Sequence, residues 1–430
     1  MRICSTYGRP HELSFRYDYE EVRMDVFDKV PDNVDSDTII TLCGRDASLI
    51  PAGFNGYVDN GTDIVHGFRS IRSYHDFKRT PDVCDIVNMF SKVQDIAKGA
   101  FTVRSFKDLS KLYEASQIIG KRHVLIGMGD MGTVTRLRSN ILGNEFTFGY
   151  IGAPTAEGQL EADVLDDLGD DCTIVGIAGC NIQHNKFTAI QNAAIKKAKL
   201  NAIPLTFDSK TSDRIGEVMV QYQIRGLNIT IPYKTEIMSM LDECSEESIK
   251  IGAVNTIVND DGKLKGYNTD CTGIMRAFAM SGYDLGNKRA LVIGSGGAAR
   301  ASAYAMKSMG CDVHVLARNE VTLLELCDDL LVEPTSDPDV SGYDIIINCT
   351  PIGMIMDSIY PFDLNTMNGD QCVLDMVYNR KTRLIQVART LGCKIISGSD
   401  VLVGQGAESF KLWFGMEPDY DAMRKAVGNE

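Results

Sequence analysis

Short hydrophobic runs recur along the first part of the chain, separated by short helical or loop segments. Eight of these runs are typical of β-strands: RICSTYG, EEVRMDVF, TIITLCG, DIVHGF, RSIRSYH, QDIAKGAF, HVLIGMG and FTFGYIG. Eight strands in this arrangement favour a (β/α)8 barrel, although such a barrel usually needs about 250 residues. The pattern therefore predicts a compact barrel-like domain over residues 1–160, with its helices cut short.

A second pattern begins after an acidic segment. Between Gln159 and Cys172, LEADVLDDLGDD has six acidic residues and no basic one, which is typical of a solvated linker or an exposed helix end. Strands and helices then alternate, from TIVGIAG and the helical FTAIQNAAIKKAKL to CKIISG. We expect a linker at 161–171, a small α/β domain at 172–272, a doubly wound Rossmann-type domain at 273–398, and C-terminal helices at 399–430 that return to the small domain.

The segment RALVIGSGGAARA places a glycine-rich turn between a strand and a helix. Gly294 allows a tight turn, Gly296 lets the backbone approach a pyrophosphate, and the helix start offers unpaired N–H groups. The next strand ends in LARN, where NAD-binding folds usually have an acid, whereas Arg318 suits a 2′-phosphate. This favours NADP, the alternative being that Arg318 is only a solvent-exposed charge.

Composition excludes some classes of partner. The chain has 44 Lys and Arg against 58 Asp and Glu, a net charge of −14, which argues against nucleic acid or an anionic membrane as a partner. The start, MRICSTYGRPHEL, lacks the apolar core of a signal peptide, so a cytoplasmic location is expected. The 12 cysteines form no CxxC and no Cys/His cluster, so no metal site is expected.

Seven motifs follow in order between Cys172 and Gly415: NITIPYK, IGAVNTI, GYNTD, GSGGAARA, NCTPIGM, MVYN and GQGAESFKLWFG. Together they resemble shikimate dehydrogenase. The resemblance implies Lys234 and Asp270 as a catalytic pair, and a lysine beside a carboxylate can move the proton that a secondary alcohol gains or loses. The implied substrate-binding residues are Asn185, Thr230, Asn255, Tyr378 and Gln405. The implied NADP-binding residues are Gly294, Ser295, Gly296, Gly297, Ala298, Ala299, Arg318, Asn319, Thr350 and Met376.

The predicted barrel, residues 1–160, contains a second set of candidate catalytic and binding residues. In EVRMD, Glu21 and Arg23 share one side of a strand by period 2, and either face a ligand or form a structural ion pair. SYHDF puts His75 at a strand end. QDIAKGAF sets Lys98 among apolar residues, where desolvation is expected to lower its pKa and free the amine to attack a ketone.

With MGTVTRL and APTAEGQ, this set resembles type I 3-dehydroquinate dehydratase. The resemblance implies an imine between Lys98 and the substrate ketone, proton transfer by His75, and a pairing of Arg136 with the substrate carboxylate. The other implied substrate-binding residues are Glu21, Arg23, Arg45, Thr155 and Gln159.

Some positions depart from the two families. No glutamate stands near the histidine, and Asp59 is a candidate replacement for another family acid. In IQHNKF, Asn185 and Phe187 occupy the place of two substrate-binding serines, and Phe187 either faces the substrate or packs into the core. In MVYNR, Arg380 stands where proline is common.

The leading hypothesis is a bifunctional enzyme that dehydrates 3-dehydroquinate to 3-dehydroshikimate and then reduces this product to shikimate with NADPH. The alternative is a single shikimate or quinate dehydrogenase on which the barrel is a structural or regulatory module. The expected partners are these small molecules, with no nucleic acid and no membrane, and a homodimer is left open.

Overall fold

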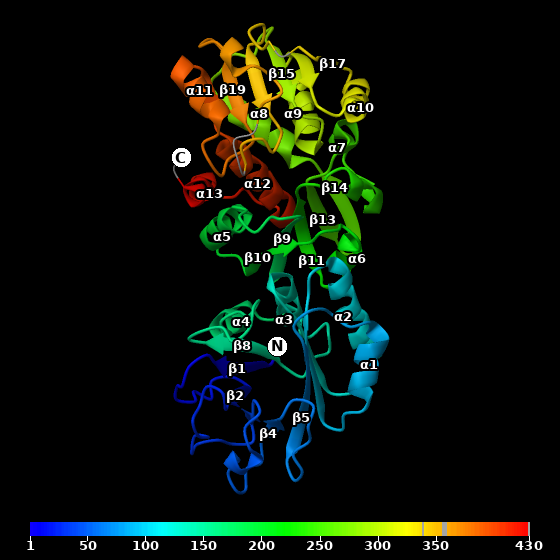
Figure 1. Cartoon of the computed structure of the whole chain (residues 1–430), viewed down its shortest axis with the longest axis vertical. Helices are drawn as coiled ribbons and strands as arrows, with labels where there is room; N and C mark the ends of the chain where they lie inside the picture. Colours follow the sequence, from blue (N-terminus) through cyan, green and yellow to red (C-terminus); the bar gives the residue numbers. More distant parts are fainter. Residues whose placement is uncertain (338, 355–358, 429–430) are drawn as a thin grey trace. The chain divides into compact units, whose positions relative to one another are not determined.

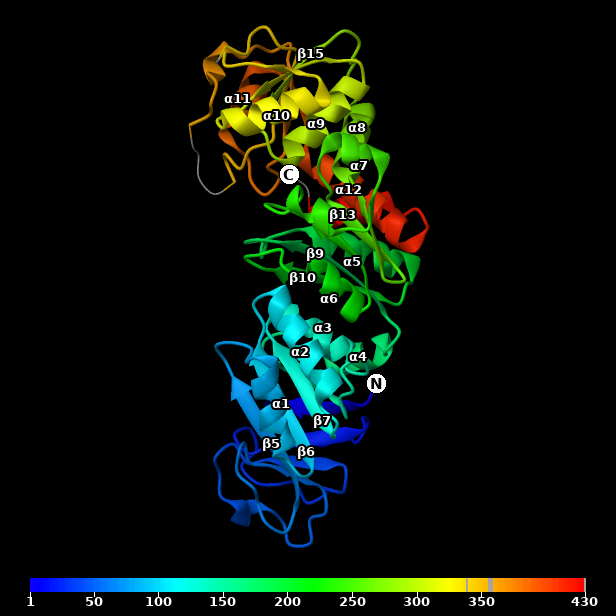
Figure 2. The ribbon, with the colours of Figure 1, turned by 90° about the vertical axis from the view of Figure 1, so that its right-hand side faces the viewer.

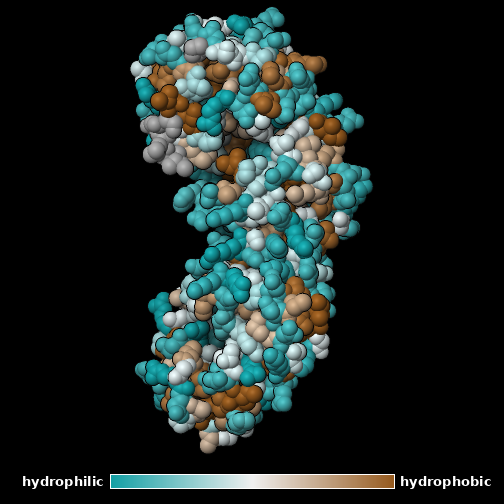
Figure 3. All heavy atoms as spheres, turned by 45° about the vertical axis from the view of Figure 1, so that its right-hand side comes forward, coloured by the Kyte–Doolittle hydropathy of each residue, from teal (hydrophilic) through white to brown (hydrophobic). Residues whose placement is uncertain are grey.

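The computed structural model describes residues 1–337, 339–354 and 359–428. The chain divides into two compact units, which are described separately: Met1–Gln183 with Asn201–Ile224, and His184–Leu200 with Arg225–Glu430. No helix in the described part of the chain is long and apolar enough to cross a membrane. Hydrophilic side chains cover most of the face drawn in Figure 3, with hydrophobic ones scattered among them.

The first unit opens with eight parallel strands in the order β7-β6-β5-β4-β3-β2-β1-β8, which form a nearly closed barrel (Figure 1). They are β1 (Ile3–Tyr7), β2 (Tyr19–Arg23), β3 (Thr38–Thr41), β4 (Tyr57–Asp59), β5 (Arg69–Asp76), β6 (Ile96–Thr102), β7 (His123–Met128) and β8 (Thr147–Ile151). The prediction of a strand at DIVHGF is wrong. That segment is a largely exposed loop, and the buried Tyr57–Asp59 pairs with β3 and β5 instead.

The barrel is compact because its first half lacks α-helices. Among the described residues, only the short 3-10 helix η1 (Ala47–Leu49) lies between β1 and β5. The later strands are followed by α1 (Val83–Ser91), α2 (Phe106–Ile118), η2 (Asp130–Gly132) with α3 (Thr133–Leu137), and α4 (Ala162–Leu168); Figure 2 shows α1 and α2 beside the later strands. Helix α4 comes from the acidic segment expected to be a linker, and it buries Ala162 and Leu165.

The inside of the barrel is layered. Toward the amino ends of the strands, the buried cluster is apolar, with Cys4, Tyr19, Ile39, Tyr57, Ile71, Ile96, Val124, Ile126, Phe146 and Phe148. Side chains alternate along a strand, so the next inward positions on β2, β4 and β6 are Glu21, Asp59 and Lys98. Polar groups therefore gather toward the carboxyl ends of the strands, where active sites of such barrels lie.

Side chains help to close the barrel between β7 and β8, the two ends of the strand order. The Leu125 N–H donates to Asn144 Oδ1 (2.7 Å), and Asn144 Nδ2 donates back to the Leu125 carbonyl (3.0 Å). Further along β7, the Gly127 N–H donates to Thr135 Oγ1 of α3 (2.9 Å). Helix α3 is thereby fixed beside β7, and it carries the next residue, Arg136, to the pocket.

The first unit also contains β9 (Thr173–Gly179), β10 (Ala202–Asp208) and α6 (Ile215–Gln221), with β9 and β10 parallel. Phe106 of α2 stacks on Phe207 of β10, with ring centroids 5.7 Å apart. The buried Arg138 donates to the carbonyls of Tyr222 (3.0 Å) and Cys172 (2.7 Å). These contacts join the barrel to the strand pair.

The second unit begins its sheet with β11 (Ile224–Ile229), β13 (Thr256–Asp260), β14 (Lys263–Tyr267) and β12 (Glu243–Cys244), paired in that order. Around it lie α5 (Phe187–Ala198), η3 (Glu236–Met240), α7 (Glu246–Ile251), α12 (Gly398–Phe414) and α13 (Tyr420–Val427). Helix α12 packs along α8 (Thr269–Ser281).

A six-stranded parallel sheet completes the second unit, in the order β17 (Glu333–Pro334), β16 (Asp312–Leu316), β15 (Arg289–Ile293), β18 (Ile345–Asn348), β19 (Cys372–Asp375) and β20 (Lys394–Ile396). Ala290 and Val292 face the side covered by α8, α9 (Gly297–Ser308) and α10 (Glu320–Leu330). Leu291 and Ile293 face the side covered by α11 (Arg383–Leu391). Helices on both faces confirm the doubly wound Rossmann-type fold.

Candidate active sites

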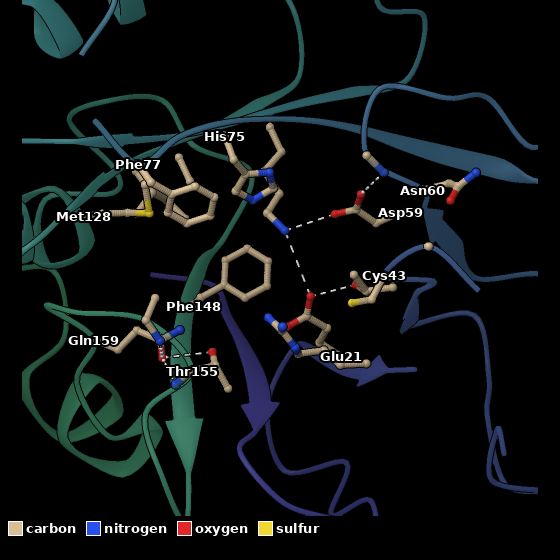
Figure 4. Close-up of a pocket in the computed structure, with 18 of the residues that line it drawn as sticks. Glu21, Cys43, Asp59, Asn60, His75, Phe77, Met128, Phe148, Thr155 and Gln159 are labelled. Carbon is tan, nitrogen blue, oxygen red and sulfur yellow. Dashed lines mark hydrogen bonds and ion pairs between the residues drawn. The ribbon is translucent and has the colours of Figure 1, made fainter. Parts of the chain in front are cut away.

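A cavity of about 480 Å³ opens at the carboxyl ends of the barrel strands (Figure 4). Seven of the residues expected at the dehydratase site line it: Glu21, Arg23, His75, Lys98, Arg136, Thr155 and Gln159. Arg45 is exposed in the loop after β3 and does not line this cavity, whereas the neighbouring Cys43 and Gly44 do. The spacing of the motifs thus brings most of the expected residues into one pocket.

Lys98 lies at the centre of this pocket. Its Nζ donates to Asp59 Oδ2 (3.0 Å), lies 4.0 Å from Glu21 Oε1, and sits 4.6 Å from the centre of the Phe148 ring. The expected lowering of the lysine pKa is wrong. Burial by itself lowers the pKa of Lys98, but the carboxylates of Asp59 and Glu21 outweigh burial and raise it. The resting lysine is therefore an ammonium held by two carboxylates.

The pKa of His75, at the end of β5, is lowered, whereas that of Lys98 is raised. Burial lowers its pKa, and the charge of Lys98 lowers it further. Its ring stacks on Phe77, with centroids 6.0 Å apart and planes 10° from parallel, while Phe77 itself is 72% exposed. A neutral imidazole beside Lys98 can accept a proton at neutral pH.

Arg136 is a buried cation, 2% exposed. Its Nε donates to the Gly158 carbonyl (3.1 Å) and its Nη1 to the Phe148 carbonyl (3.5 Å). Burial lowers its pKa to about 10, with no carboxylate contributing to the shift. A guanidinium has five N–H donors, so several remain for an anionic ligand in the cavity.

Glu21 and Arg23 have different partners, which does not support the alternative of a structural ion pair between them. Glu21 accepts from Thr41 Oγ1 (2.7 Å). Arg23 forms a two-pronged pair with Asp25, from Nε to Oδ1 (3.1 Å) and from Nη2 to Oδ2 (2.7 Å). Both side chains line the cavity, as a role in ligand binding requires.

Thr155 and Gln159 lie in the loop after β8. Gln159 Oε1 accepts from the Thr155 N–H (2.7 Å) and from Thr155 Oγ1 (3.1 Å). The amide group of Gln159 is thereby oriented, and its Nε2 is the donor that can serve a ligand. Figure 4 shows both residues on the side of the pocket away from Asp59.

Sequence reasoning named Asp59 only as a candidate replacement and did not place it at the site. The structure brings its carboxylate into contact with Lys98, Ser73 Oγ (2.5 Å) and the Gly61 N–H (3.0 Å). The period-2 alternation of a strand at Tyr57–Asp59 would have pointed Asp59 inward, but a more obvious hydrophobic run follows it.

In the second unit, Lys234 Nζ and Asp270 Oδ2 are 2.5 Å apart. Lys234 follows β11 just after the cis peptide bond Ile231–Pro232, and Asp270 is in the first turn of α8, 5% exposed. An acid in the first turn of a helix is stabilised by the helix dipole. The structure therefore brings together the two residues expected to form the proton-transfer pair.

The expected substrate-binding residues are linked by polar contacts. Asn255 Oδ1 accepts from the Thr269 N–H (2.7 Å), and Asn255 Nδ2 lies 3.4 Å from Gln405 Oε1. The Ile229 N–H donates to the Asn255 carbonyl (2.7 Å), which places the following residue, Thr230, beside this group. Burial and then the charge of Asp270 raise the pKa of Tyr378, so its hydroxyl stays protonated at neutral pH.

The glycine turn has the geometry that a dinucleotide needs. Gly294 has φ +119°, a conformation that favours glycine, and the space where a Cβ of Gly296 would lie is open. A Cβ on Gly297 would come within 3.0 Å of Lys234 Cβ, so glycine allows the start of α9 to approach the catalytic lysine. The turn therefore fits a pyrophosphate at the start of α9, beside the proton-transfer pair.

The remaining expected cofactor residues surround this turn. Ser295 Oγ lies 2.7 Å from Thr322 Oγ1, and Asn319 Oδ1 accepts from the Thr322 N–H, which caps α10. Arg318 is exposed at the end of β16, and Thr350 Oγ1 donates to Asn348 Oδ1 (2.6 Å). Ala298 and Ala299 are in the first turn of α9, and Met376 is partly buried after β19. An exposed arginine at the second strand end fits a 2′-phosphate.

In the IQHNKF segment, Phe187 is buried, whereas His184 is exposed and Asn185 is partly exposed. Phe187 is 3% exposed and meets Trp413 edge-on, with ring centroids 6.0 Å apart. Asn185 Oδ1 accepts from the Phe187 N–H (2.9 Å), and Lys186 Nζ donates to the Val427 carbonyl (2.9 Å). The structure supports core packing of Phe187, while Asn185 stands at the start of α5.

The fold and the two sites define a chain with two α/β enzyme parts, a barrel with a buried lysine and a Rossmann-type oxidoreductase. Residues 60–169 match the family model of type I 3-dehydroquinase. Residues 177–257 match the shikimate dehydrogenase substrate binding domain, and residues 398–427 match the shikimate 5′-dehydrogenase C-terminal domain. The chain belongs to the shikimate dehydrogenase family and carries a type I 3-dehydroquinase domain in front.

Relatives agree with the assignment to the shikimate dehydrogenase family. Shikimate dehydrogenase (NADP(+)) of Dehalococcoides mccartyi strain CBDB1 is 38% identical over 270 residues, covering 59% of this chain and 94% of the relative. The crystal structure of shikimate dehydrogenase from Aquifex aeolicus has a TM-score of 0.58 at 30% identity, covering 61% of this chain and 99% of that one. The Thermus thermophilus enzyme in complex with NADP(H) and shikimate has a TM-score of 0.56 at 29% identity, covering 59% and 98%.

Proposed function

We propose that this chain is a bifunctional enzyme that dehydrates 3-dehydroquinate to 3-dehydroshikimate and reduces 3-dehydroshikimate to shikimate with NADPH. The observation that carries the proposal is the barrel cavity. It holds Lys98, His75 and Arg136 together, in a chain whose other half belongs to the shikimate dehydrogenase family. The product of the first reaction is the substrate of the second, which gives a reason for the two domains to share one chain.

In the barrel, the buried Arg136 binds the substrate carboxylate and so places the ketone near Lys98. The amine of Lys98 forms an imine with the ketone carbon, which makes a proton on the neighbouring carbon easier to remove. His75, kept neutral by burial and by Lys98, takes and returns protons during the loss of water. The cavity, of about 480 Å³, is large enough for a small cyclic acid.

In the second unit, Lys234 and Asp270 transfer a proton to or from the substrate oxygen. When the ketone is reduced, its oxygen needs a proton, and the 2.5 Å contact lets the two side chains act as one acid–base unit. Asn255 and Gln405 orient the hydroxyls of the substrate, and Tyr378 donates from its protonated hydroxyl. NADPH, when bound along the glycine turn, supplies the hydride.

The barrel and the dehydrogenase part are tested separately. Borohydride added with 3-dehydroquinate should trap a covalent adduct at Lys98, because an imine is reducible and an ion pair is not. Shikimate and NADP⁺ should give NADPH with the same protein. An active dehydratase without an adduct at Lys98 would refute the imine.

A second candidate substrate for the dehydrogenase is quinate. It is favoured by Asn185, which stands in the place of a substrate-binding serine, and by the likeness to quinate dehydrogenase from Corynebacterium glutamicum in complex with NAD, at a TM-score of 0.55 and 28% identity, covering 59% of this chain and 98% of that one. Oxidation rates for quinate and shikimate at equal concentration decide between them.

The domain boundaries at residues 160, 171, 272 and 398 stay predictions, as does a cytoplasmic location. A homodimer is also a prediction, and sedimentation of the purified chain measures it.

A further inference from the structure

The roles proposed above do not explain how the Lys98 ammonium loses the proton that it must lose before it can attack the ketone. Its ammonium lies in a buried site, and an ammonium has no lone pair with which to attack a ketone. Among the described residues, the Lys98 ammonium donates to Asp59 and not to His75, so the imidazole is not placed to take that proton first. Another group must take a proton from Lys98 before the imine can form.

Asp59 is the carboxylate in hydrogen-bond contact with Lys98. The distance from Nζ to Asp59 Oδ2 is 3.0 Å, against 4.0 Å to Glu21 Oε1. Asp59 is 2% exposed, and the Gly61 N–H (3.0 Å) and Ser73 Oγ (2.5 Å) fix its orientation. Figure 4 shows Asp59 on the same side of the pocket as Glu21, away from Phe77 and Gln159.

We propose that Asp59 is a catalytic residue of the dehydratase, which takes a proton from the Lys98 ammonium and returns it to the oxygen that leaves as water. This inference rests on the proposed function of the barrel. Substrate entering the cavity displaces water from around the ion pair, and a drier site favours the neutral pair of amine and carboxylic acid over separated charges. The short contact lets the proton cross without a water.

The proposed step balances. One proton passes from Nζ to Asp59, and the freed lone pair forms a C–N bond with the ketone carbon. The carbonyl oxygen collects the proton held by Asp59 and a second proton from Nζ, and it leaves as water while the C=N bond forms. The third proton stays on nitrogen as the iminium, and Asp59 is again a carboxylate.

Other charged or titratable groups also affect Lys98 or its neighbour His75. Besides Asp59, they come from β1 and β2 and are Cys4, Glu21 and Arg23. Glu21 is already hydrogen-bonded to Thr41 and lies farther from Nζ. Its charge supports the ammonium, whereas Asp59 is in position to receive the proton.

Two roles of Asp59 give opposite results when the carboxylate becomes an amide. If Asp59 only holds the ammonium by its charge, Asp59→Asn lowers the pKa of Lys98, frees the amine and moves imine formation to lower pH. If Asp59 takes the proton, Asp59→Asn removes the acceptor, and the lysine must lose its proton to water. Imine formation then slows by on the order of 10² at neutral pH and recovers partly as the pH rises.

The measurement is the rate of borohydride trapping of 3-dehydroquinate at Lys98, followed by intact mass across a pH series. The exposed Asp32→Asn serves as the matched control, and shikimate oxidation by the same preparation reports that the chain is folded. Slow trapping by Asp59→Asn, with partial rescue by Asp59→Glu, supports the proposal. Trapping by Asp59→Asn at the native rate, or faster at lower pH, overturns it while leaving the imine mechanism intact.

Absence of an adduct in the native protein overturns both this inference and the proposed dehydratase. If Asp59→Asn does not fold, Ser73→Ala carries the test. This change removes a second hydrogen-bond donor from Asp59 Oδ2, the oxygen that accepts from Lys98 Nζ, and leaves this oxygen free to take the proton. Faster trapping by Ser73→Ala supports proton transfer to Asp59, and unchanged or slower trapping overturns it.

Discussion

Replacing Arg136 by methionine should damage substrate binding far more than it damages the fold. The guanidinium is buried, and its pKa of about 10 reflects burial. At about 1.4 kcal/mol per pKa unit, this lowering corresponds to about 3 kcal/mol against the charged form. At pH 7 the group is charged in both the folded and unfolded states, so this penalty is fully present and methionine removes it.

The substitution also removes the donors to the Gly158 and Phe148 carbonyls, the second of which is long at 3.5 Å. An unpaired buried carbonyl costs about 1–3 kcal/mol, so gain and loss largely cancel. The free energy of unfolding of Arg136→Met should stay within about 2 kcal/mol of the native value. Two lost charge-assisted hydrogen bonds to the substrate carboxylate, at about 1.5–3 kcal/mol each, should raise KM for 3-dehydroquinate by about 10² or more.

The neighbouring Arg138 offers a matched control. It is also buried, but its donors go to the carbonyls of Tyr222, Cys172 and Asp170 within the first unit. Arg138→Met should lower the free energy of unfolding by about 3 kcal/mol or more with little change in KM. Denaturant unfolding and dehydratase kinetics on both variants make the comparison. A native KM in Arg136→Met, or a stability loss like that of Arg138→Met, would refute the assignment of Arg136 to the substrate carboxylate.

Three further predictions concern the second unit. Lys234→Ala and Asp270→Asn should each lower kcat for shikimate much more than they change KM, and the double variant should lose much less than the sum, because the pair acts as one unit; a near-native kcat in either single variant would assign that residue a structural role. Arg318→Ala should remove most of the preference for NADP(H) over NAD(H) without lowering the maximal rate, and equal use of both cofactors by the native chain would contradict this. Phe187→Ser should lower the free energy of unfolding by about 3–5 kcal/mol, since it empties a buried site against Trp413, and a lower KM without loss of stability would show that Phe187 faces the substrate.

Sequence patterns located most of the barrel strands and most of the expected residues that line the cavity, because these patterns depend on local spacing. Lys98 stands out as a charge inside an apolar strand, and the structure places it in the cavity. The strand at Tyr57–Asp59 was missed because it has only three residues and a more hydrophobic loop follows it. Short strands depend on their neighbours for stability, so their own sequence says little about them.

The electrostatics of the site could not be predicted from the sequence. Local context correctly indicated that burial favours a neutral Lys98, but the sign of the pKa shift depends on Asp59 and Glu21, which come from other strands. The same limit applies to Arg45, whose loop leaves it exposed, and to Phe187, whose packing partner Trp413 is far along the chain. The pKa shift of Lys98, the exposure of Arg45 and the packing of Phe187 all depend on distances between segments that are far apart in the sequence.

The most direct test of the bifunctional account is to supply the purified full-length chain with 3-dehydroquinate and NADPH and no other enzyme. The account predicts that shikimate accumulates and that one NADPH is oxidised for each shikimate formed. It would be contradicted if 3-dehydroquinate and NADPH both remained while added 3-dehydroshikimate was reduced at once, because the barrel would then lack dehydratase activity.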